Sequence, residues 1–229
     1  ESSYREGETT HFRLRYNGRA APELARGILR TLEAEFDEIS SALNYVPPEP
    51  IGVILYTNQT FTDITRAPSW VGALNDGRIR VPVEGLTSMT GELARVLKHE
   101  LTHSFVGQKT GGRCPVWLQE GIAQYMEGKR SGNAAAALSA AYERHMEFSL
   151  ASYETSWMNL PRETAANAYA WSLAAVEAIV GVDGMVDLGK ILDRLAAGSA
   201  TEDAVKAVLR DSYADLMQTT VQYLRKAYL

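Results

Sequence analysis

The amino-acid sequence predicts an α+β fold, in which a small N-terminal mixed sheet packs on helices and the C-terminal part is mostly helical. The first third of the chain alternates strand patterns with helical patterns, whereas from about Ser88 onward the pattern is helical to the end. No internal repeat and no linker interrupts the 229 residues. We therefore expect a single domain with an α/β sheet part over residues 1–86 and a helical part over residues 87–229.

The N-terminal part contains strand signals separated by a helix. The segment "HFRLRY" (11–16) alternates apolar and polar residues, as a half-buried strand does, and Pro22 opens a helical pattern that "VPPEP" ends after Leu43. The apolar run "IGVILY" (51–56) predicts a central strand, and a brief helix is expected near residues 61–65. In "VGALNDGRIRVPV", Asp76-Gly77 lies between two strand-like flanks and predicts a tight hairpin.

The sequence of the C-terminal part predicts a series of helices. In "GELARVLKHELTHSF" the apolar residues recur at helical spacing, at Leu93, Val96, Leu97, Leu101 and Phe105. Gly107 suits the end of this helix, and Pro115 suits the first turn of the next one, "PVWLQEGIAQYMEG". Further helices are expected at about residues 133–148, 162–180, 184–197 and from 201 to the end.

Composition and charge exclude several classes of function. The formal net charge is −5 and no cluster of Lys and Arg stands out, so we expect no nucleic-acid partner. No uninterrupted apolar segment approaches the roughly 18–20 residues that span a bilayer, so we expect no transmembrane segment in this chain. Hydrophobic residues make up 45% and charged residues 22%, which is typical of a globular domain with a buried core.

A few residues are interpreted as having no chemical role. Cys114 is the single cysteine, which rules out an internal disulfide and favours a small packed residue over a catalytic thiol. His11 and His145 have no partner at ligand spacing and are interpreted as structural or surface residues. The chain begins at Glu1 rather than Met, so we expect a trimmed or processed product. Any signal peptide for export, lipid anchor or upstream domain would then have been removed.

The segment "KHELTHSF" carries the strongest chemical signal. Residues four apart on a helix project from one face, so His99 and His103 can direct two imidazole nitrogens at one point. Glu100 lies about 100° around the helix axis, within reach of a water bound at that point. A catalytic zinc site needs a third protein ligand and an open fourth position. A Gly-rich turn followed by an antiparallel helix could deliver Glu120 to the same metal.

The combination of H-E-L-T-H with a following P-x-W-L-x-E-G-x-A resembles the gluzincin metallopeptidases, specifically the bacterial peptidase MA-like domains related to thermolysin. The segments "NAYAWSLAAVEAIV" and "GMVDLGKILDRLAAGSATEDAVKAVL" are similar to the helical C-terminal part of those domains. The resemblance implies a zincin-like fold that holds one Zn²⁺ through His99, His103 and Glu120. It also implies that Glu100 is the general base and that an edge strand lies over the cleft.

Two further residues are candidates for the same site. The resembled domains carry a tyrosine on the helix that faces the zinc, and Tyr169 in "NAYAWS" stands at that position. Its hydroxyl is either the donor to the oxyanion or a packed surface group, and Tyr125 and Tyr153 are weaker alternatives. Gln124 stands one turn after Glu120, where thermolysin-like enzymes place an acidic residue. Its amide oxygen either accepts a hydrogen bond from the second ring N–H of a ligand histidine, or the side chain faces solvent.

These observations predict a zinc-dependent metallopeptidase acting on peptide or protein substrates. The segment "VGALNDG" lacks the glutamate with which aminopeptidases of this clan bind a free amine, which favours an endopeptidase-like cleft. The main rival hypothesis is a zinc-holding binding or scaffold domain with little or no activity. Glu100 argues against it, because a purely structural zinc needs no adjacent base, and structural sites are usually rich in thiolates. A metal-free helical protein would require both motifs to be coincidental.

Overall fold

The computed structural model describes residues 4–17, 22–56, 74–75, 77–83, 85–146, 149–157 and 159–229. The helix predicted near residues 61–65, and Asp76 of the predicted hairpin, lie outside these residues. The chain clusters into two compact units, Glu1–Phe105 and Val106–Leu229, here called the N-terminal and C-terminal units. The boundary falls inside helix α3 (Gly91–Thr110). The single domain divided at residue 87 stays a prediction.

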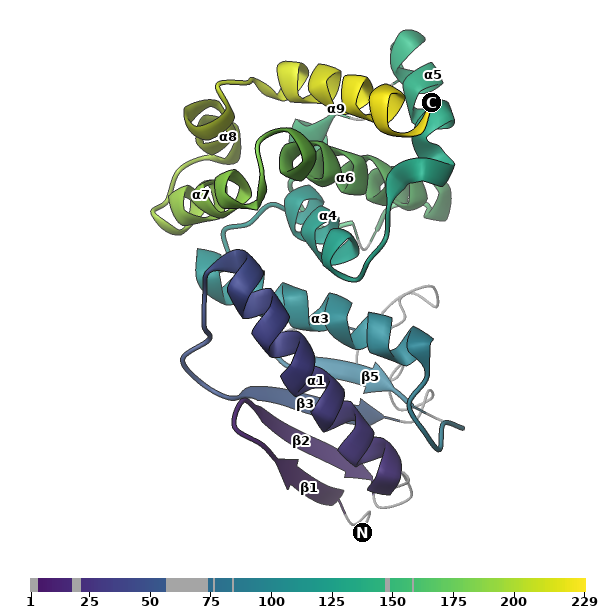
Figure 1. The fold of residues 1–229 in the computed structure, drawn as a ribbon, viewed down its shortest axis with the longest axis vertical. Helices are drawn as coiled ribbons and strands as arrows, with labels where there is room; N and C mark the ends of the chain where they lie inside the picture. The colour runs from purple at the N-terminus through teal and green to yellow at the C-terminus, as the bar shows by residue number, and fades with distance from the viewer. Residues whose placement is uncertain are drawn as a thin grey trace. The chain divides into compact units, whose positions relative to one another are not determined.

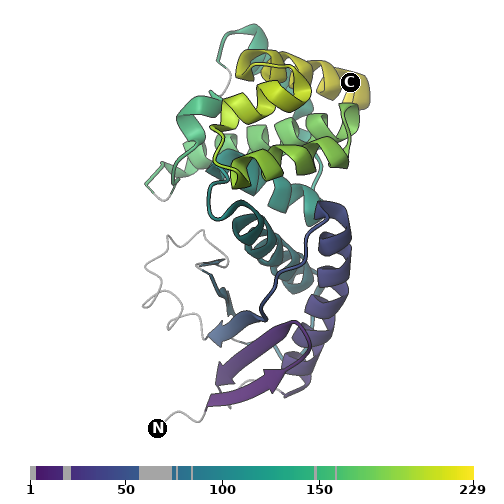
Figure 2. The same cartoon turned by 90° about the vertical axis from the view of Figure 1, so that its left-hand side faces the viewer.

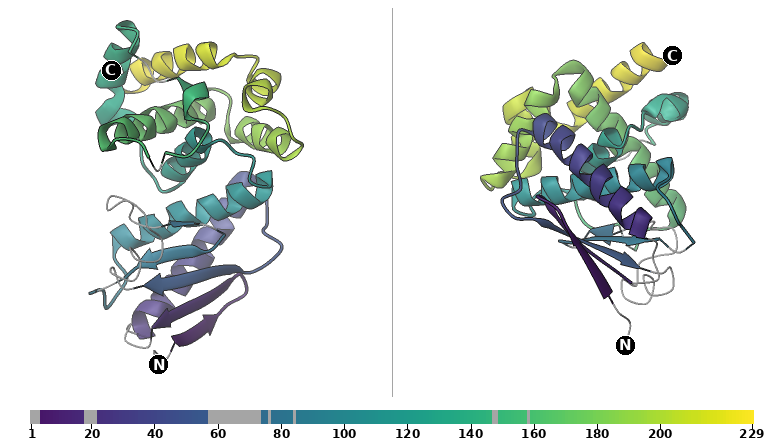
Figure 3. Two further views of the ribbon diagram at one scale, coloured as in Figure 1. Left: turned by 180° about the vertical axis from the view of Figure 1, so that it is seen from behind. Right: turned by 60° about the horizontal axis from the view of Figure 1, so that its bottom comes forward.

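The N-terminal unit contains a mixed sheet, as predicted. Its strands are β1 (Tyr4–Glu8), β2 (Phe12–Asn17), β3 (Ile51–Tyr56), β4 (Leu74–Asn75) and β5 (Ile79–Pro82), in the order β1-β2-β3-β5-β4. The inner pairs β2–β3 and β3–β5 are parallel, while the outer strands β1 and β4 pair antiparallel with their neighbours. Figure 3 shows the larger strands side by side.

Helix α1 (Pro22–Leu43) has the bounds that the sequence predicts and covers one face of the sheet (Figure 1, and from the side in Figure 2). Phe36 on α1 joins the layers, because its ring lies 5.9 Å from that of Phe12 on β2 and 4.9 Å from that of Phe105 on α3. Both contacts are edge-to-face, an arrangement that aromatic rings prefer. The part of α3 that belongs to this unit is therefore fixed on the same core as the sheet.

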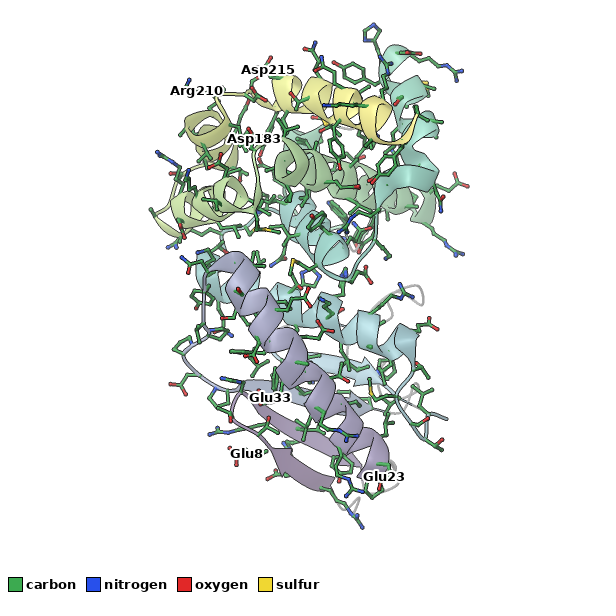
Figure 4. The ribbon with its side chains drawn as sticks, viewed as in Figure 1. Glu8, Glu23, Glu33, Asp183, Arg210 and Asp215 are labelled. Atoms are coloured by element: carbon green, nitrogen blue, oxygen red, sulfur yellow. The ribbon has the colours of Figure 1, made fainter. Side chains whose placement is uncertain are left out.

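His11 is part of this core packing, in agreement with its predicted structural role. Its ring stacks on Phe36 at 3.8 Å between centroids, and its backbone N–H and Nδ1 lie 3.0 and 2.6 Å from the carboxylate oxygens of Glu33. Figure 4 shows Glu33 on α1 beside the sheet. Burial alone would raise the pKa of Glu33, but the hydrogen bonds that its carboxylate accepts outweigh burial and lower the pKa.

The C-terminal unit is helical, as predicted. It comprises α4 (Val116–Met126), α5 (Ala135–Glu143), α6 (Arg162–Val182), α7 (Met185–Ala196), α8 (Thr201–Leu209) and α9 (Tyr213–Tyr228), with short 3₁₀ turns η1 (Ser131–Ala134) and η2 (Leu150–Tyr153). Helices α4, α7 and α9 all pack on α6. By length and composition α6 could cross a membrane, but 61% of its apolar stretch is buried inside the protein, as in any core helix.

The prediction of one helix from residue 201 to the end is wrong, because the chain breaks between α8 and α9. Arg210 adopts a left-handed conformation with φ of 66°, which ends α8. Ser212 and Asp215 then form a reciprocal capping box that starts α9. Figure 4 shows Arg210 and Asp215 on either side of this break. The signal in the sequence is the S-x-x-D pattern, which satisfies two backbone N–H groups at a helix start.

Candidate metal centre

Helix α3 begins with a side-chain cap and carries the H-E-x-x-H segment in its middle. The hydroxyl of Thr90 accepts a hydrogen bond from Leu93 N at 3.1 Å. Glu92 lies in the first turn, where a negative charge interacts favourably with the helix dipole. One apolar stripe of the helix is buried, consisting of Leu93, Leu97, Leu101 and Phe105. Burial of this stripe orients the helix about its axis, so the polar residues between the apolar ones take fixed positions.

The two histidines of α3 face one another, as their spacing predicts. Their Nε2 atoms lie 3.1 Å apart, and the ring planes are inclined at 82°. Two imidazole nitrogens that bind one Zn²⁺ at about 2.0–2.1 Å in a tetrahedral arrangement lie about 3.4 Å apart. The observed separation of His99 and His103 therefore fits a shared metal ion almost without rearrangement. Both side chains are half-buried.

Glu100 is buried beside this pair, with 6% of its surface exposed. The preceding residue anchors the helix: Nζ of Lys98 lies 2.7 Å from a carboxylate oxygen of Glu35 and 2.7 Å from one of Glu38, both on α1. Burial alone would lower the pKa of Lys98, but the two carboxylates outweigh burial and raise it, so the ammonium stays charged. The segment that carries His99 and Glu100 is thus held to α1 by two ion pairs.

Helix α4 carries Glu120 and packs closely on α6. Pro115 is the N-cap in an extended conformation, so it precedes the helix rather than filling its first turn. A Cβ added to Gly121 would lie 2.4 Å from the backbone oxygen of Ser172 on α6. Because it has no side chain, Gly121 permits the backbone of α6 to approach α4 closely. The glycine next to Glu120 therefore sets how near the two helices come.

One ligand atom from each of His99, His103 and Glu120 lies within 4.8 Å of the others. The donor set consists of two imidazoles and a carboxylate with no thiolate, which is the set of a catalytic zinc site with an open fourth position rather than of a closed structural site. These three residues could hold a metal ion.

Gln124 is buried, with 5% of its surface exposed, so the alternative in which it faces solvent is wrong. Its Nε2 group donates to the backbone oxygen of Tyr169 at 2.9 Å and to that of Glu120 at 3.3 Å. The side chain therefore links the backbone of α4 to that of α6. Its support of a ligand histidine through the amide oxygen stays a prediction.

Tyr169 lies on α6 with a half-buried side chain. Its ring meets the ring of Trp157 edge-on, with centroids 5.1 Å apart and planes at 90°. Trp157 in turn meets Tyr153 edge-on at 6.1 Å. No sequence pattern marks Trp157, because it stands in an irregular segment between η2 and α6. The structure thus brings Tyr169 together with Gln124 and with an aromatic ladder.

The remaining predicted residues are placed elsewhere. Tyr125 lies on α4 with the guanidinium of Arg130 4.1 Å from its ring centroid. Burial raises the pKa of the Cys114 thiol, so the thiolate that a nucleophile or a metal ligand needs is disfavoured, in agreement with its predicted packing role. His145 is exposed and adopts a left-handed conformation with φ of 54° just after α5. None of these residues belongs to the group formed by His99, His103 and Glu120.

Comparison with known proteins gives one family. The model of the peptidase MA superfamily matches residues 40–224. The matched range contains all of α3, α4 and α6, and with them every residue predicted for the site. A search of curated proteins finds no match to the chain.

Proposed function

The chain belongs to the peptidase MA superfamily, and on this basis we propose that it is a zinc-dependent metallopeptidase of the gluzincin type that hydrolyses peptide bonds. The observation that carries the proposal is the pair of imidazole nitrogens 3.1 Å apart on α3, next to a buried glutamate. A glutamate beside a metal-binding pair is what hydrolysis requires and what metal storage does not. In this proposal His99, His103 and Glu120 bind one Zn²⁺.

Each residue of the proposed site has a separate role in the reaction. A bound Zn²⁺ would polarise the scissile carbonyl and lower the pKa of a bound water from about 15.7 toward about 7. Glu100 accepts the proton of the attacking water and passes it to the leaving amine. Its burial keeps bulk water from competing for that proton. Tyr169 donates a hydrogen bond to the oxyanion that develops on the carbonyl oxygen, where a second donor beside the metal is needed.

An endopeptidase is the form of this activity that we propose, with peptide or protein substrates. The edge of the sheet at β4 pairs antiparallel with β5 on one side only among the described strands. An extended peptide can add to such an edge through main-chain hydrogen bonds, without requiring a free terminus. The rival function, a zinc-holding scaffold without activity, predicts no use for Glu100.

Matched substitutions on α3 and α4 test the proposal. We expect Glu100→Gln to keep one zinc per chain and to lower the rate of peptide cleavage by about 10²–10⁴-fold, because it removes the general base. We expect Glu120→Ala to lose most of the bound zinc, because two imidazoles are an incomplete site. Glu92→Gln, at an exposed position in the first turn of α3, is the control and should change neither.

Zinc content by plasma mass spectrometry and cleavage of a broad fluorogenic peptide library are the two measurements. A protein that takes up no zinc on reconstitution would refute the proposal. A protein that binds one zinc per chain but cleaves no peptide would favour the scaffold instead. Equal loss of zinc from Glu100→Gln and Glu120→Ala would show that Glu100 is a ligand and not a base.

A further inference from the structure

We propose that Trp157 is a positioning residue that holds the ring of Tyr169 in the orientation from which its hydroxyl acts. The inference rests on the proposed function, since it concerns the oxyanion donor of that reaction. It is carried by contacts within the C-terminal unit alone. Trp157 lies outside every regular helix of this unit, yet only 5% of its surface is exposed.

The contact between the two rings is specific in direction. The planes of Trp157 and Tyr169 are perpendicular, with centroids 5.1 Å apart. Aromatic rings at this distance prefer an edge-to-face arrangement, because the positive edge of one ring meets the negative face of the other. Rotation of the Tyr169 ring about its side-chain bonds would break this arrangement. The indole therefore selects one rotamer of a side chain that is otherwise half-exposed.

The indole is itself held in place. Its Nε1–H donates to the backbone oxygen of Tyr153 at 3.3 Å, and the Tyr153 ring meets it edge-on at 6.1 Å. The next residue, Glu154, accepts a hydrogen bond at its backbone oxygen from Val116 N at 3.0 Å. Val116 is the first residue of α4, the helix that carries Glu120. The segment with Trp157 is thus fastened to the helix of the proposed third ligand.

Tyr169 is consequently fixed at both ends of the residue. Gln124 on α4 donates to its backbone oxygen at 2.9 Å, and Trp157 packs against its ring. A donor that is already oriented before substrate binds need not be ordered during the reaction. The oxyanion exists in the transition state and not in the bound substrate, so this orientation should affect kcat and leave KM nearly unchanged.

A double-mutant cycle tests whether Trp157 acts through Tyr169. The variants are Trp157→Leu, Tyr169→Phe and the two combined, assayed as zinc-loaded protein on the fluorogenic peptide that the unmodified protein cleaves fastest. We expect Tyr169→Phe to lower kcat by about 10²-fold, as the loss of an oxyanion donor does. We expect Trp157→Leu to lower kcat by about tenfold through misplacement of the hydroxyl, and to add less than about twofold in the Tyr169→Phe background.

Trp157→Phe is the conservative variant, and it should recover most of the lost kcat because a smaller ring keeps the edge-to-face contact. It also keeps the test informative if Trp157→Leu does not fold. Zinc content should be the same in all variants. Multiplicative effects in the combined variant, or a fall in kcat with Trp157→Phe equal to that with Trp157→Leu, would overturn the inference.

A second readout does not depend on activity. In metal-free protein labelled with ¹³C-tyrosine, the ring signals of Tyr169 are those absent from Tyr169→Phe. The ring current of Trp157 should displace these signals, so we expect them to move in Trp157→Leu and to broaden or average as the ring gains freedom. Unchanged signals would overturn the inference even if no peptide were cleaved. Conversely, moved signals in a protein without peptidase activity would leave the placement of Tyr169 supported and the proposed function refuted.

Discussion

The side-chain amide of Gln124 makes two hydrogen bonds that no carboxylate could make. Its Nε2 donates to the backbone oxygens of Tyr169 and Glu120, and both of these groups are acceptors. The thermolysin-related domains that the sequence resembles carry an acidic residue at this position. In this chain an acidic side chain would present negative oxygens to two carbonyls in a buried site, which is unfavourable.

We therefore predict that Gln124→Glu destabilises the protein at pH 7. The substitution removes two donors and buries a charge, so we expect a loss of about 2–3 kcal/mol in the free energy of unfolding. Urea denaturation followed by far-UV circular dichroism measures it. Gln218→Glu, at an exposed position on α9, is the control and should change the free energy of unfolding by less than about 0.5 kcal/mol. Equal stability of the two variants would contradict the prediction.

At the same scale, the sequence could predict residues whose spacing is local but not residues whose contacts depend on packing. His99 and His103 lie four apart on one helix, so their shared face follows from helix geometry alone. Trp157 touches Tyr169 because an irregular segment folds back onto α6. No pattern in the sequence predicts that this segment folds back onto α6. The alternative in which Gln124 faces solvent was likewise excluded only by its burial and by its hydrogen bond to the backbone of α6.

At the scale of secondary-structure elements, the crossing of α4 and α6 is the feature on which the proposed site depends. Gly121 permits this crossing, since an added Cβ would lie 2.4 Å from the backbone oxygen of Ser172 and 2.6 Å from Cγ2 of Val176. A backbone oxygen in a helix has little freedom to move aside. Any side chain at this position must therefore push the two helices apart.

We predict that Gly121→Ala lowers the free energy of unfolding by about 3 kcal/mol, because the added methyl group overpacks the helix crossing. The same change should weaken zinc binding, since Glu120 is the adjacent residue. Thermal unfolding and zinc content measure the two effects.

The control for this substitution is Gly189→Ala on α7, where nothing lies within 4 Å of the added Cβ. Alanine has the higher helix propensity, so this variant should gain about 0.5–1 kcal/mol. The two helical glycines thus predict opposite signs for the same chemical change. A loss of similar size in both variants would mean that the crossing at Gly121 is not the cause.

The predictability of the elements follows from how strongly each one is marked. Helix α1 has the predicted bounds because proline stands at its start and a Pro-rich segment follows its end. Strand β1 was not predicted, because it is an edge strand whose charged residues pair with the next strand, as Glu8 does with Arg13 at 3.1 Å. Its pairing stabilises it, and its own composition shows no apolar alternation.

At the scale of the whole molecule, the chain changes from one compact unit to the next within the helix that carries the histidines. Residues up to Phe105 belong to the N-terminal unit, and those from Val106 belong to the C-terminal unit. The sequence predicted a change from sheet to helices near residue 87, since composition and periodicity change there. The periodicity of apolar residues does not show which helix packs with which. The position of the boundary between the two compact units therefore could not be predicted from it.

The last prediction concerns the three proposed ligands, which lie on α3 and α4. A metal that binds only the folded chain stabilises it by about 4 kcal/mol when free zinc is 1,000 times the dissociation constant. If His99, His103 and Glu120 all bind it, unfolding of either α3 or α4 releases the ion. We therefore expect zinc to slow amide hydrogen exchange in the most protected residues of α1 and of α6 alike, measured by mass spectrometry with zinc and with a chelator.

The variant Glu120→Ala separates this coupling from simple binding to the histidine pair. In that variant any zinc still held by α3 should protect α1 without protecting α6, because the C-terminal unit no longer supplies a ligand. The control is Glu163→Ala, at an exposed position in the first turn of α6, which leaves the proposed ligands intact. Glu127→Ala is a poor control, because it would disturb the ion pair of Glu127 with Lys129. Protection of α6 by zinc in Glu120→Ala, equal to that in Glu163→Ala, would show that the third ligand lies elsewhere.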